Sequence, residues 1–260
     1  MKIFKKIFIY SFIFVFVAFC GFRLYLLNKT VVPIVMYHNV ENIDLHKSNW
    51  TSVTAFKQQM DFLRRYNYNV ISLETLVTAI ENGESLPKKS IVITFDDGYE
   101  NNYLNAFPLL ENYGFPATIF IPTDFIGKPG YLNGTQMLEM TASVVTIGSH
   151  TKIHDYLPDM TPDEQLAQIV GSKWVLEERL GMPIDFIAYP IGGFTEEIKG
   201  MVKKAGYKAA CATNRGYDRF NKDVYELNRV RFSSSDNSCL ILWAKLSGYY
   251  NLFRKAKSPY

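Results

Sequence analysis

The sequence predicts an α/β protein in which parallel strands are covered by helices, preceded by an N-terminal transmembrane helix. Short runs rich in Val, Ile and Phe alternate along the 260 residues with longer segments of helical periodicity. Because parallel strands need crossover connections, this alternation places the helices outside the sheet. About seven runs are strand-like, which favours a distorted, incomplete (β/α)7 barrel over an open sheet, although periodicity alone does not choose between them.

Residues 1–28 differ in composition from the rest of the chain. Three lysines precede an uncharged run over residues 7–22, which Arg23 follows. The run suits a signal peptide, or a short membrane span if Arg23 snorkels. A phenylalanine before Cys20 is unsuited to lipoprotein processing, and no small-residue cleavage site follows. We therefore expect an uncleaved single-pass membrane anchor, with one catalytic domain over residues 29–260 on the extracytoplasmic side.

Charge outside this N-terminal segment is nearly balanced. The first 30 residues hold five of the 28 lysines and arginines and no acidic residue, which leaves 23 basic against 25 acidic residues. This balance argues against a nucleic-acid partner. The chain has three cysteines and no Cys-x-x-Cys spacing, so a thiolate metal site is disfavoured. A disulfide between Cys211 and Cys239 and two buried free thiols both remain open.

In the first half of the domain, apolar runs and turn residues mark out the elements. Strands are expected over residues 33–37, 68–72, 91–95 and 117–121. Helices are expected over residues 55–66 and 73–82 and up to residue 112. Gly83 and Gly114 suit the ends of two of these helices, since glycine readily adopts the left-handed conformation found there. Residues 39–52 and 122–134 are polar or rich in glycine and proline, and predict loops.

In the second half of the domain, one helix start has a clear capping pattern. Thr161 precedes a proline and stands three residues before Glu164, which is typical of a capped helix that here runs to Leu180 and ends at Gly181. Strands are expected over residues 144–148, 186–189, 208–212 and 225–230. Helices are expected over residues 195–205 and 240–249.

Two adjacent carboxylates follow the strand over residues 91–95. They are Asp96 and Asp97, and Gly98 comes next. Burying like charges side by side is costly, so such a pair needs a cation or a proton to hold it. Gly98 permits a sharp turn that lets both side chains face one cavity. Seen alone, the motif is typical of a solvated turn.

A second polar cluster, Ser149-His150-Thr151-Lys152-Ile153-His154, follows the strand over residues 144–148. On a helical turn, this spacing would place both imidazoles on one face. Two imidazoles and one carboxylate form a ligand set for a borderline metal such as zinc, with positions left open for water and substrate. Three of the four histidines in the chain come just after predicted strands, which argues against ordinary polar positions.

Taken together, Thr94-Phe95-Asp96-Asp97-Gly98 and the histidine cluster resemble the polysaccharide deacetylases with a NodB-like domain (carbohydrate esterase family 4). The likeness extends over roughly residues 33–235. It implies a distorted barrel with its site at the carboxyl ends of the strands. It also implies one divalent metal ion, zinc ahead of cobalt or nickel, held by Asp97, His150 and His154.

The resemblance implies a metal-dependent hydrolase that removes N-acetyl groups from an extracellular or cell-wall polysaccharide containing N-acetylglucosamine. Asp96 would be the general base that takes a proton from the attacking water. Two alternatives remain open: an esterase that removes O-acetyl groups from a polysaccharide, and a catalytically inactive sugar-binding module tethered to the membrane. The sequence identifies no protein partner.

A third motif departs from the family pattern. Ala188-Tyr189-Pro190-Ile191-Gly192 resembles an Arg-x-Pro-aromatic segment, with Ala188 in place of the arginine that steadies the base. Ile191 replaces the aromatic residue, and its backbone N–H can still donate to an oxyanion. Arg229 is a candidate to replace the missing arginine, and an exposed arginine is the alternative. The resemblance thus assigns Ile191, Leu157 and Arg229 to substrate binding. Leu157 resembles a residue that lines the acetyl pocket of the family, and a position in the core is its alternative.

The family usually places an acid histidine near the C-terminus, but no histidine follows His154 here. Instead, Met36-Tyr37-His38-Asn39-Val40 resembles the membrane-associated branch that deacetylates poly-β-1,6-N-acetylglucosamine, whose acid histidine precedes the double-aspartate motif. This resemblance implies that His38 is the general acid. Closure of a barrel makes the first and last strands neighbours. A histidine after the first strand can therefore occupy the same place as a histidine near the C-terminus. His46, in a polar loop, is expected on the surface.

Overall fold

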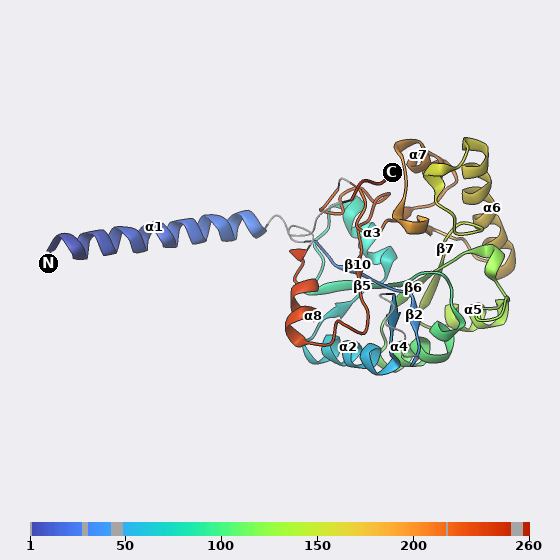
Figure 1. The fold of residues 1–260 in the computed structure, drawn as a ribbon, viewed down its shortest axis with the longest axis horizontal. Helices are drawn as coiled ribbons and strands as arrows, with labels where there is room; N and C mark the ends of the chain where they lie inside the picture. Colours follow the sequence, from blue (N-terminus) through green and yellow to red (C-terminus); the bar gives the residue numbers. More distant parts are fainter. Residues whose placement is uncertain (1, 28–30, 43–48, 217, 251–256) are drawn as a thin grey trace.

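The computed structural model describes residues 2–27, 31–42, 49–216, 218–250 and 257–260. Its centre is a curled sheet of parallel strands with helices outside it (Figure 1). The strands of this sheet are β1 (Ile34–Tyr37), β4 (Asn69–Val70), β5 (Ser90–Phe95), β6 (Ala117–Ile121), β7 (Val145–Ser149), β8 (Phe186–Ala188), β9 (Ala209–Cys211) and β10 (Val230–Arg231). They follow the order β10, β1, β5, β6, β7, β8, β9, and β4 pairs with the start of β5.

Helices cover the outside of this sheet (Figure 1). They are α2 (Val53–Arg65), α3 (Leu73–Asn82), α4 (Phe107–Tyr113), α5 (Gly134–Thr141), α6 (Pro162–Leu180), α7 (Glu196–Lys204) and α8 (Cys239–Lys245). Short helical turns occupy Asn102–Ala106, Thr123–Phe125, Leu157–Asp159 and Pro190–Gly192. A separate pair of strands, β2 (Asn39–Val40) and β3 (Trp50–Thr51), lies within the predicted loop over residues 39–52.

The main strands are short and apolar because both of their faces are covered. Every residue of β1, β5 and β6 is buried. One face packs inside the curled sheet and the other packs under helices, so no polar side alternates along the sequence. This burial explains why the strands stand out as continuous apolar runs. The predicted α/β class, with parallel strands curled into an incomplete barrel, is confirmed.

The edges of the sheet are joined through residues 224–231. Ala210 donates a backbone hydrogen bond to Val224 at 2.9 Å, and Leu227 donates to Ala210 at 3.0 Å. The same segment continues as β10 and pairs with β1, where Val35 lies opposite Val230. The first and last strands of the chain are therefore neighbours, as barrel closure requires. A full strand over residues 225–230 was predicted, but only Val230–Arg231 forms one, because the segment shifts from one edge to the other.

The predicted cap of α6 is confirmed. The Thr161 side chain accepts a hydrogen bond from the Glu164 N–H, and the Glu164 carboxylate accepts one from the Thr161 N–H. Helix α5 was not predicted, although it begins with an equivalent pair, Asn133 and Gln136. Its start lies within a stretch rich in glycine and proline, which favours a loop prediction. Cys211 is buried and Cys239 is exposed, and both are free thiols.

The N-terminal helix α1 (Lys2–Leu27) extends away from the domain (Figure 1). Among the residues that the structure describes, no helix has an apolar stretch long enough to cross a membrane. The predicted transmembrane helix is therefore not confirmed. The predicted boundary between residues 28 and 29, and the predicted surface position of His46, lie outside the described residues.

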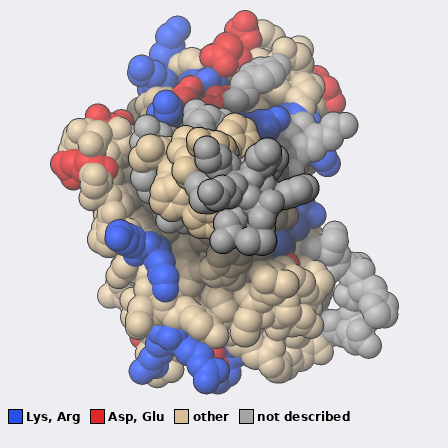
Figure 2. Space-filling view, turned by 90° about the vertical axis from the view of Figure 1, so that its left-hand side faces the viewer, with Lys and Arg blue, Asp and Glu red and all other residues tan. Residues whose placement is uncertain are grey.

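Charged side chains are scattered over the face from which α1 projects. Figure 2 shows lysines and arginines separated by uncharged residues, with acidic groups among them. This view contains no continuous basic surface among the described residues. The expectation that nucleic acid is not a partner rests on charge balance and stays a prediction.

Candidate active site

Four predicted site residues follow the carboxyl ends of three strands. His38 comes directly after β1, Asp96 and Asp97 come after β5, and His150 comes after β7. Parallel strands end at the same rim of a curled sheet, so these side chains meet there. They border a cavity of about 290 Å³. Its lining residues are His38, Asn49, Asp96, Asp97, His150, His154, Ile191, Thr213, Asn214, Arg215, Arg231 and Lys257.

Asp97, His150 and His154 turn their ligand atoms toward one another. Oδ1 of Asp97 lies 3.7 Å from Nε2 of His150 and 3.2 Å from Nε2 of His154. One ligand atom from each residue lies within 4.8 Å of the other two. Asp97 and Gly98 both adopt positive φ, at 72° and 66°. The chain therefore turns sharply after β5, which is uncommon for a residue other than glycine and brings the carboxylate to the cavity.

His154 reaches the site from an irregular loop. The two histidines do not lie on a helical turn, so the predicted reason for their proximity is wrong. Thr151 and His154 both have positive φ, at 64° and 63°. Oε1 of Gln168, on α6, accepts hydrogen bonds from the backbone N–H groups of Lys152 and Ile153 at 2.9 and 3.1 Å. The hydrogen bonds from this loop to Gln168 and its positive φ values, and not helical periodicity, bring His154 close to Asp97.

A backbone carbonyl fixes the orientation of His150. Nδ1 of His150 lies 2.7 Å from the carbonyl oxygen of Ala188. Because a carbonyl only accepts, Nδ1 carries the proton and Nε2 keeps its lone pair for the site. Burial lowers the pKa of His150 to about 4, against the opposing charges of Asp96 and Asp97. The ring is therefore neutral at neutral pH.

These donors fit a divalent cation. Imidazole nitrogens and a carboxylate are the usual ligands of zinc and related metals. Oδ1 of Asp97 is buried and has no hydrogen-bond partner within the described ranges. A buried carboxylate oxygen without a partner is costly, and a cation bound between Asp97 and the two histidines would remove that cost.

Asp96 is held by a buried arginine. Nη1 and Nη2 of Arg229 donate to the two carboxylate oxygens of Asp96 at 2.6 and 2.8 Å. Nε of Arg229 donates to the carbonyl oxygen of Ala212 at 2.8 Å. Burial by itself would raise the pKa of Asp96, but the Arg229 charge, helped by His150 and His38, holds that pKa well below its usual range. Asp96 is therefore ionised at neutral pH.

Two of the three residues predicted to bind substrate do not line the cavity. Arg229 is completely buried, so it is not the exposed arginine of the alternative prediction, and it does not line the cavity. It instead supplies the guanidinium that Ala188 lacks, from a distant part of the chain. Leu157 is also completely buried and lies outside the cavity lining, so it is a core residue. Ile191 does line the cavity.

His38 lies at the cavity with one ring nitrogen buried. Its Nδ1 has no hydrogen-bond partner in the part of the chain that the structure describes. Its backbone carbonyl accepts a hydrogen bond from Nδ2 of Asn102 at 2.7 Å, which fixes the chain after β1. Burial lowers the pKa of His38, whereas the charges of Asp96 and Asp97 raise it and that of Arg231 lowers it further.

The third motif forms a tight turn with a strained residue. Ile191 has φ 58° and ψ 1°, a left-handed conformation that is rare for a β-branched side chain and costs on the order of 1–3 kcal/mol. Nε of Arg215 donates to the carbonyl oxygen of Ile191 at 3.1 Å and helps to hold this conformation. Strain of this kind persists where the surroundings fix the backbone, which is typical of a functional turn.

Replacing Gly192 by alanine is expected to destabilise the protein by about 2–4 kcal/mol. Gly192 has φ 76°, and an added Cβ would lie 2.3 Å from Oγ1 and 2.8 Å from the backbone nitrogen of Thr213. Urea denaturation measures the change. Gly200→Ala is the matched control, since a Cβ there meets nothing within 4 Å on α7. Equal stability of the two variants would contradict the prediction.

Several polar residues of the cavity escaped prediction from the sequence. Arg215 follows β9, Arg231 lies on β10, and Lys257 belongs to the C-terminal segment 257–260. For Arg215 and Arg231, a signal existed: both stand at or just beyond predicted strand ends, where a barrel site is built. Lys257 carried no such signal, because only tertiary contacts bring the C-terminal segment to this rim.

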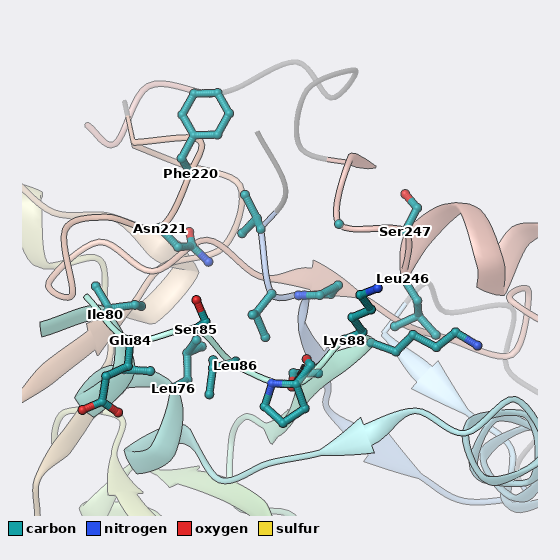
Figure 3. A pocket seen from close by; sticks show the side chains of 18 residues that line it. Leu76, Ile80, Glu84, Ser85, Leu86, Lys88, Phe220, Asn221, Leu246 and Ser247 are labelled. Carbon is teal, nitrogen blue, oxygen red and sulfur yellow. Dashed lines mark hydrogen bonds between the residues drawn. The ribbon is translucent and has the colours of Figure 1, made fainter. Parts of the chain in front are cut away.

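A second cavity, of about 500 Å³, lies at the start of β1 and β5 and is therefore far from their carboxyl ends (Figure 3). Its charged lining residues are Glu84, Lys88 and Lys89. The described lining includes no histidine, aspartate or cysteine. The larger cavity thus lacks a metal-ligand set, whereas the smaller one contains Asp97, His150 and His154.

Comparisons with known proteins identify the family of this chain. The family model described as polysaccharide deacetylase matches residues 83–210. YxkH of Bacillus subtilis (strain 168), which is assigned as a polysaccharide deacetylase, is 32% identical over 78% of this chain and 71% of its own. The poly-β-1,6-N-acetyl-D-glucosamine N-deacetylase of Staphylococcus aureus (strain MSSA476) is 26% identical over 72% of this chain and 69% of its own.

Solved structures agree as well. The deacetylase PplD of Streptococcus pyogenes, in complex with acetate, superposes with a TM-score of 0.72 at 28% identity, covering 78% of this chain and 92% of that one. IcaB from Ammonifex degensii superposes with the same TM-score at 23% identity, covering 83% and 97%, which shows a shared fold. The predicted resemblance is confirmed. With this identity to YxkH over most of both chains, the protein belongs to the polysaccharide deacetylase family.

Proposed function

We propose that the protein hydrolyses N-acetyl groups of a polysaccharide containing N-acetylglucosamine, using one divalent metal ion. The observation that carries the proposal is the arrangement of Asp97, His150 and His154 beside Asp96 and His38 at one cavity. Sugar binding alone requires no base beside a ligand set, whereas hydrolysis of an amide benefits from both. The substrate named for the Staphylococcus aureus relative supports the choice of an N-acetyl polymer.

Asp97, His150 and His154 would hold the metal, with zinc preferred over cobalt or nickel. When bound there, a divalent cation supplies Lewis-acid chemistry, lowering the pKa of a water to about 7 and polarising a carbonyl. The hydrogen bond from His150 to Ala188 keeps Nε2 directed at the site before any metal arrives, so little reorganisation is needed.

The protons would be handled by two side chains on this chain. Asp96, kept ionised and immobile by Arg229, accepts the proton of the attacking water. His38 donates a proton to the nitrogen of the leaving amine, which could not depart as an anion. The backbone N–H of Ile191, at the strained turn, donates to the oxyanion as the acetamide carbon becomes tetrahedral.

The function is tested with the purified full chain, stripped of metal and reloaded with zinc, cobalt or nickel. N-acetylglucosamine oligomers and cell-wall glycan are expected to yield acetate and free amine in equal amounts, and the stripped protein is expected to yield neither. Acetate from acetylated xylan without amine from the oligomers would identify an O-acetyl esterase instead. Metal and oligosaccharide binding without any acetate would identify a binding module.

Replacing His38 by glutamine is expected to lower kcat by about 10²–10⁴-fold while metal content stays unchanged. Because burial lowers the pKa of His38, its protonated form is a minor species at neutral pH and grows as pH falls. The activity of the wild type should therefore decline toward alkaline pH, and the variant should lose this dependence. A variant with the same pH profile and kcat as the wild type would remove His38 from the mechanism.

We also propose that the domain acts outside the cytoplasm. This placement is supported by the lysines before the uncharged run in the sequence. The test is protease treatment of intact cells and of lysed cells expressing the full chain. Digestion of the domain in intact cells is expected, and protection until lysis would contradict the placement.

A further inference from the structure

Three cationic side chains line the cavity and take no direct part in the proposed proton transfers. They are Arg215, Arg231 and Lys257, and each comes from a different part of the chain. In the described residues, none of the three forms an ion pair. The two carboxylates of the cavity are already engaged: Asp96 is paired with Arg229, and Asp97 faces the two histidines. The cavity therefore carries unbalanced positive charge.

The wall that carries two of these cations is held by several hydrogen bonds. Nη1 of Arg215 donates to the carbonyl oxygen of Ser258 at 2.8 Å, and its guanidinium lies over the ring of Tyr156 at 5.5 Å. The backbone nitrogen of Lys257 donates to the carbonyl oxygen of Asn214 at 3.1 Å. Pro259 accepts hydrogen bonds from Phe194 and Tyr156. The C-terminal segment is thus fixed against the site, and Lys257 with it.

Arg231 reaches the cavity from β10, next to β1. It lies opposite Met36 of β1, two residues before His38. Its strand neighbour Val230 is buried, while Arg231 itself is exposed and lines the cavity, as alternation along a strand requires. Its charge also acts on His38, the pKa of which it lowers. Arg215 and Lys257 therefore reach the cavity from two paired segments, and Arg231 reaches it from β10.

We propose that the sugar acetylated at this site carries, on itself or on its neighbour, an anionic group that Arg215, Arg231 and Lys257 bind. The group is a carboxylate or a phosphate, for which arginine and lysine are the usual protein ligands. This inference rests on the proposed deacetylase function of the same cavity. The cavity measures about 290 Å³, which is near the lower limit for small-ligand sites. In so small a space, an acetamide group beside Asp97 and an anionic group beside the three cationic side chains must lie close together. The two groups therefore belong to the same sugar or to adjacent sugars.

The test compares substrates matched in everything except charge. The first pair is a cell-wall glycan fragment with a carboxylate on the acetylated sugar, and the same fragment with that carboxylate converted to an amide. A glycan bearing phosphate forms the second arm and separates the two sources of anion. At least one anionic substrate is expected to show kcat/KM about tenfold higher than its neutral counterpart, and raising ionic strength from about 0.05 to 0.5 M should narrow the difference.

Variants connect this preference to the named side chains. Arg231→Gln and Lys257→Gln are each expected to reduce the ratio of anionic to neutral kcat/KM by about tenfold. Lys204→Gln removes an exposed positive charge on α7 and is the control that should leave the ratio unchanged. Calorimetric binding of the same fragments is measured in parallel, and tighter binding of the anionic member is expected.

Two failures are distinguishable. Acetate release at equal rates from charged and neutral substrates, or variants that lower both rates equally, would overturn this inference and leave the deacetylase function intact. If no substrate releases acetate, the proposed function fails, and the binding measurements still decide on the charge preference. Equal binding of charged and neutral fragments would overturn the inference in that case too.

Discussion

Replacing Arg229 by methionine is expected to lower the free energy of unfolding by about 3–5 kcal/mol at neutral pH. The change leaves Asp96 ionised and buried without its bidentate partner. The wild-type pair stabilises the fold above the unfolded pKa of the carboxyl and loses this contribution as pH falls through its depressed folded pKa. In the variant the carboxyl pKa is raised by burial, so acid relieves the penalty. Denaturation from pH 7 to pH 4 should show the two stabilities converging.

The controls for this prediction separate charge from packing. Arg229→Met combined with Asp96→Asn leaves no net charge at the site and is expected to recover most of the lost stability, as for other buried pairs. Arg65→Met removes an exposed arginine on α2 and is expected to change stability by less than about 0.5 kcal/mol. A gap between wild type and Arg229→Met that does not depend on pH would show that packing, and not the charge of Asp96, dominates.

Replacing Asp96 by asparagine is expected to lower kcat by about 10²–10⁴-fold without loss of metal, since asparagine accepts no proton from water. Replacing Asp97 by asparagine is expected to lose both metal and activity, because Asp97 supplies the anionic ligand that faces both histidines. Metal content by elemental analysis, read alongside acetate release, separates the two roles.

The adjacent pair makes this a strict comparison. Both substitutions remove one negative charge from neighbouring positions at the end of β5, so a general electrostatic effect would act on both alike. Thermal unfolding of each variant without metal checks that the fold survives. An Asp96→Asn protein with full turnover would end its assignment as the base, and an Asp97→Asn protein with full metal content would end the ligand assignment.

Local signals in the sequence were sufficient for most of the fold. The strands appear as apolar runs because both faces are buried, and the α6 cap between Thr161 and Glu164 involves residues only three apart. Asp96, Asp97 and His150 follow predicted strand ends, and the carboxyl ends of parallel strands share a rim, so their proximity could be expected. The choice of Asp97 over Asp96 as the metal ligand came from the family resemblance. Each of these signals is contained in a few consecutive residues.

Contacts between distant residues escaped the same reasoning. Arg229 pairs with Asp96 across 133 residues, through closure of the sheet at residues 224–231. The sequence alone left open whether Arg229 is this partner or an exposed side chain. The return of His154 depends on positive φ values and on Gln168, which no periodicity reveals. Helix α5 was not predicted, because the glycine and proline residues near its start favour a loop.

The sequence by itself determined the parallel α/β class and the cap of α6, because burial period and capping chemistry act over short spans of chain. The candidate metal ligands came from short motifs and from the resemblance that these motifs carry. The tertiary structure alone decided that Arg229 is buried against Asp96 and not exposed, that Leu157 belongs to the core, and that Lys257 comes to the rim of the site. Those outcomes depend on how the chain closes on itself. Patterns within a few residues do not reveal such contacts, because each contact joins segments that are far apart in the sequence and are brought together only by the whole fold.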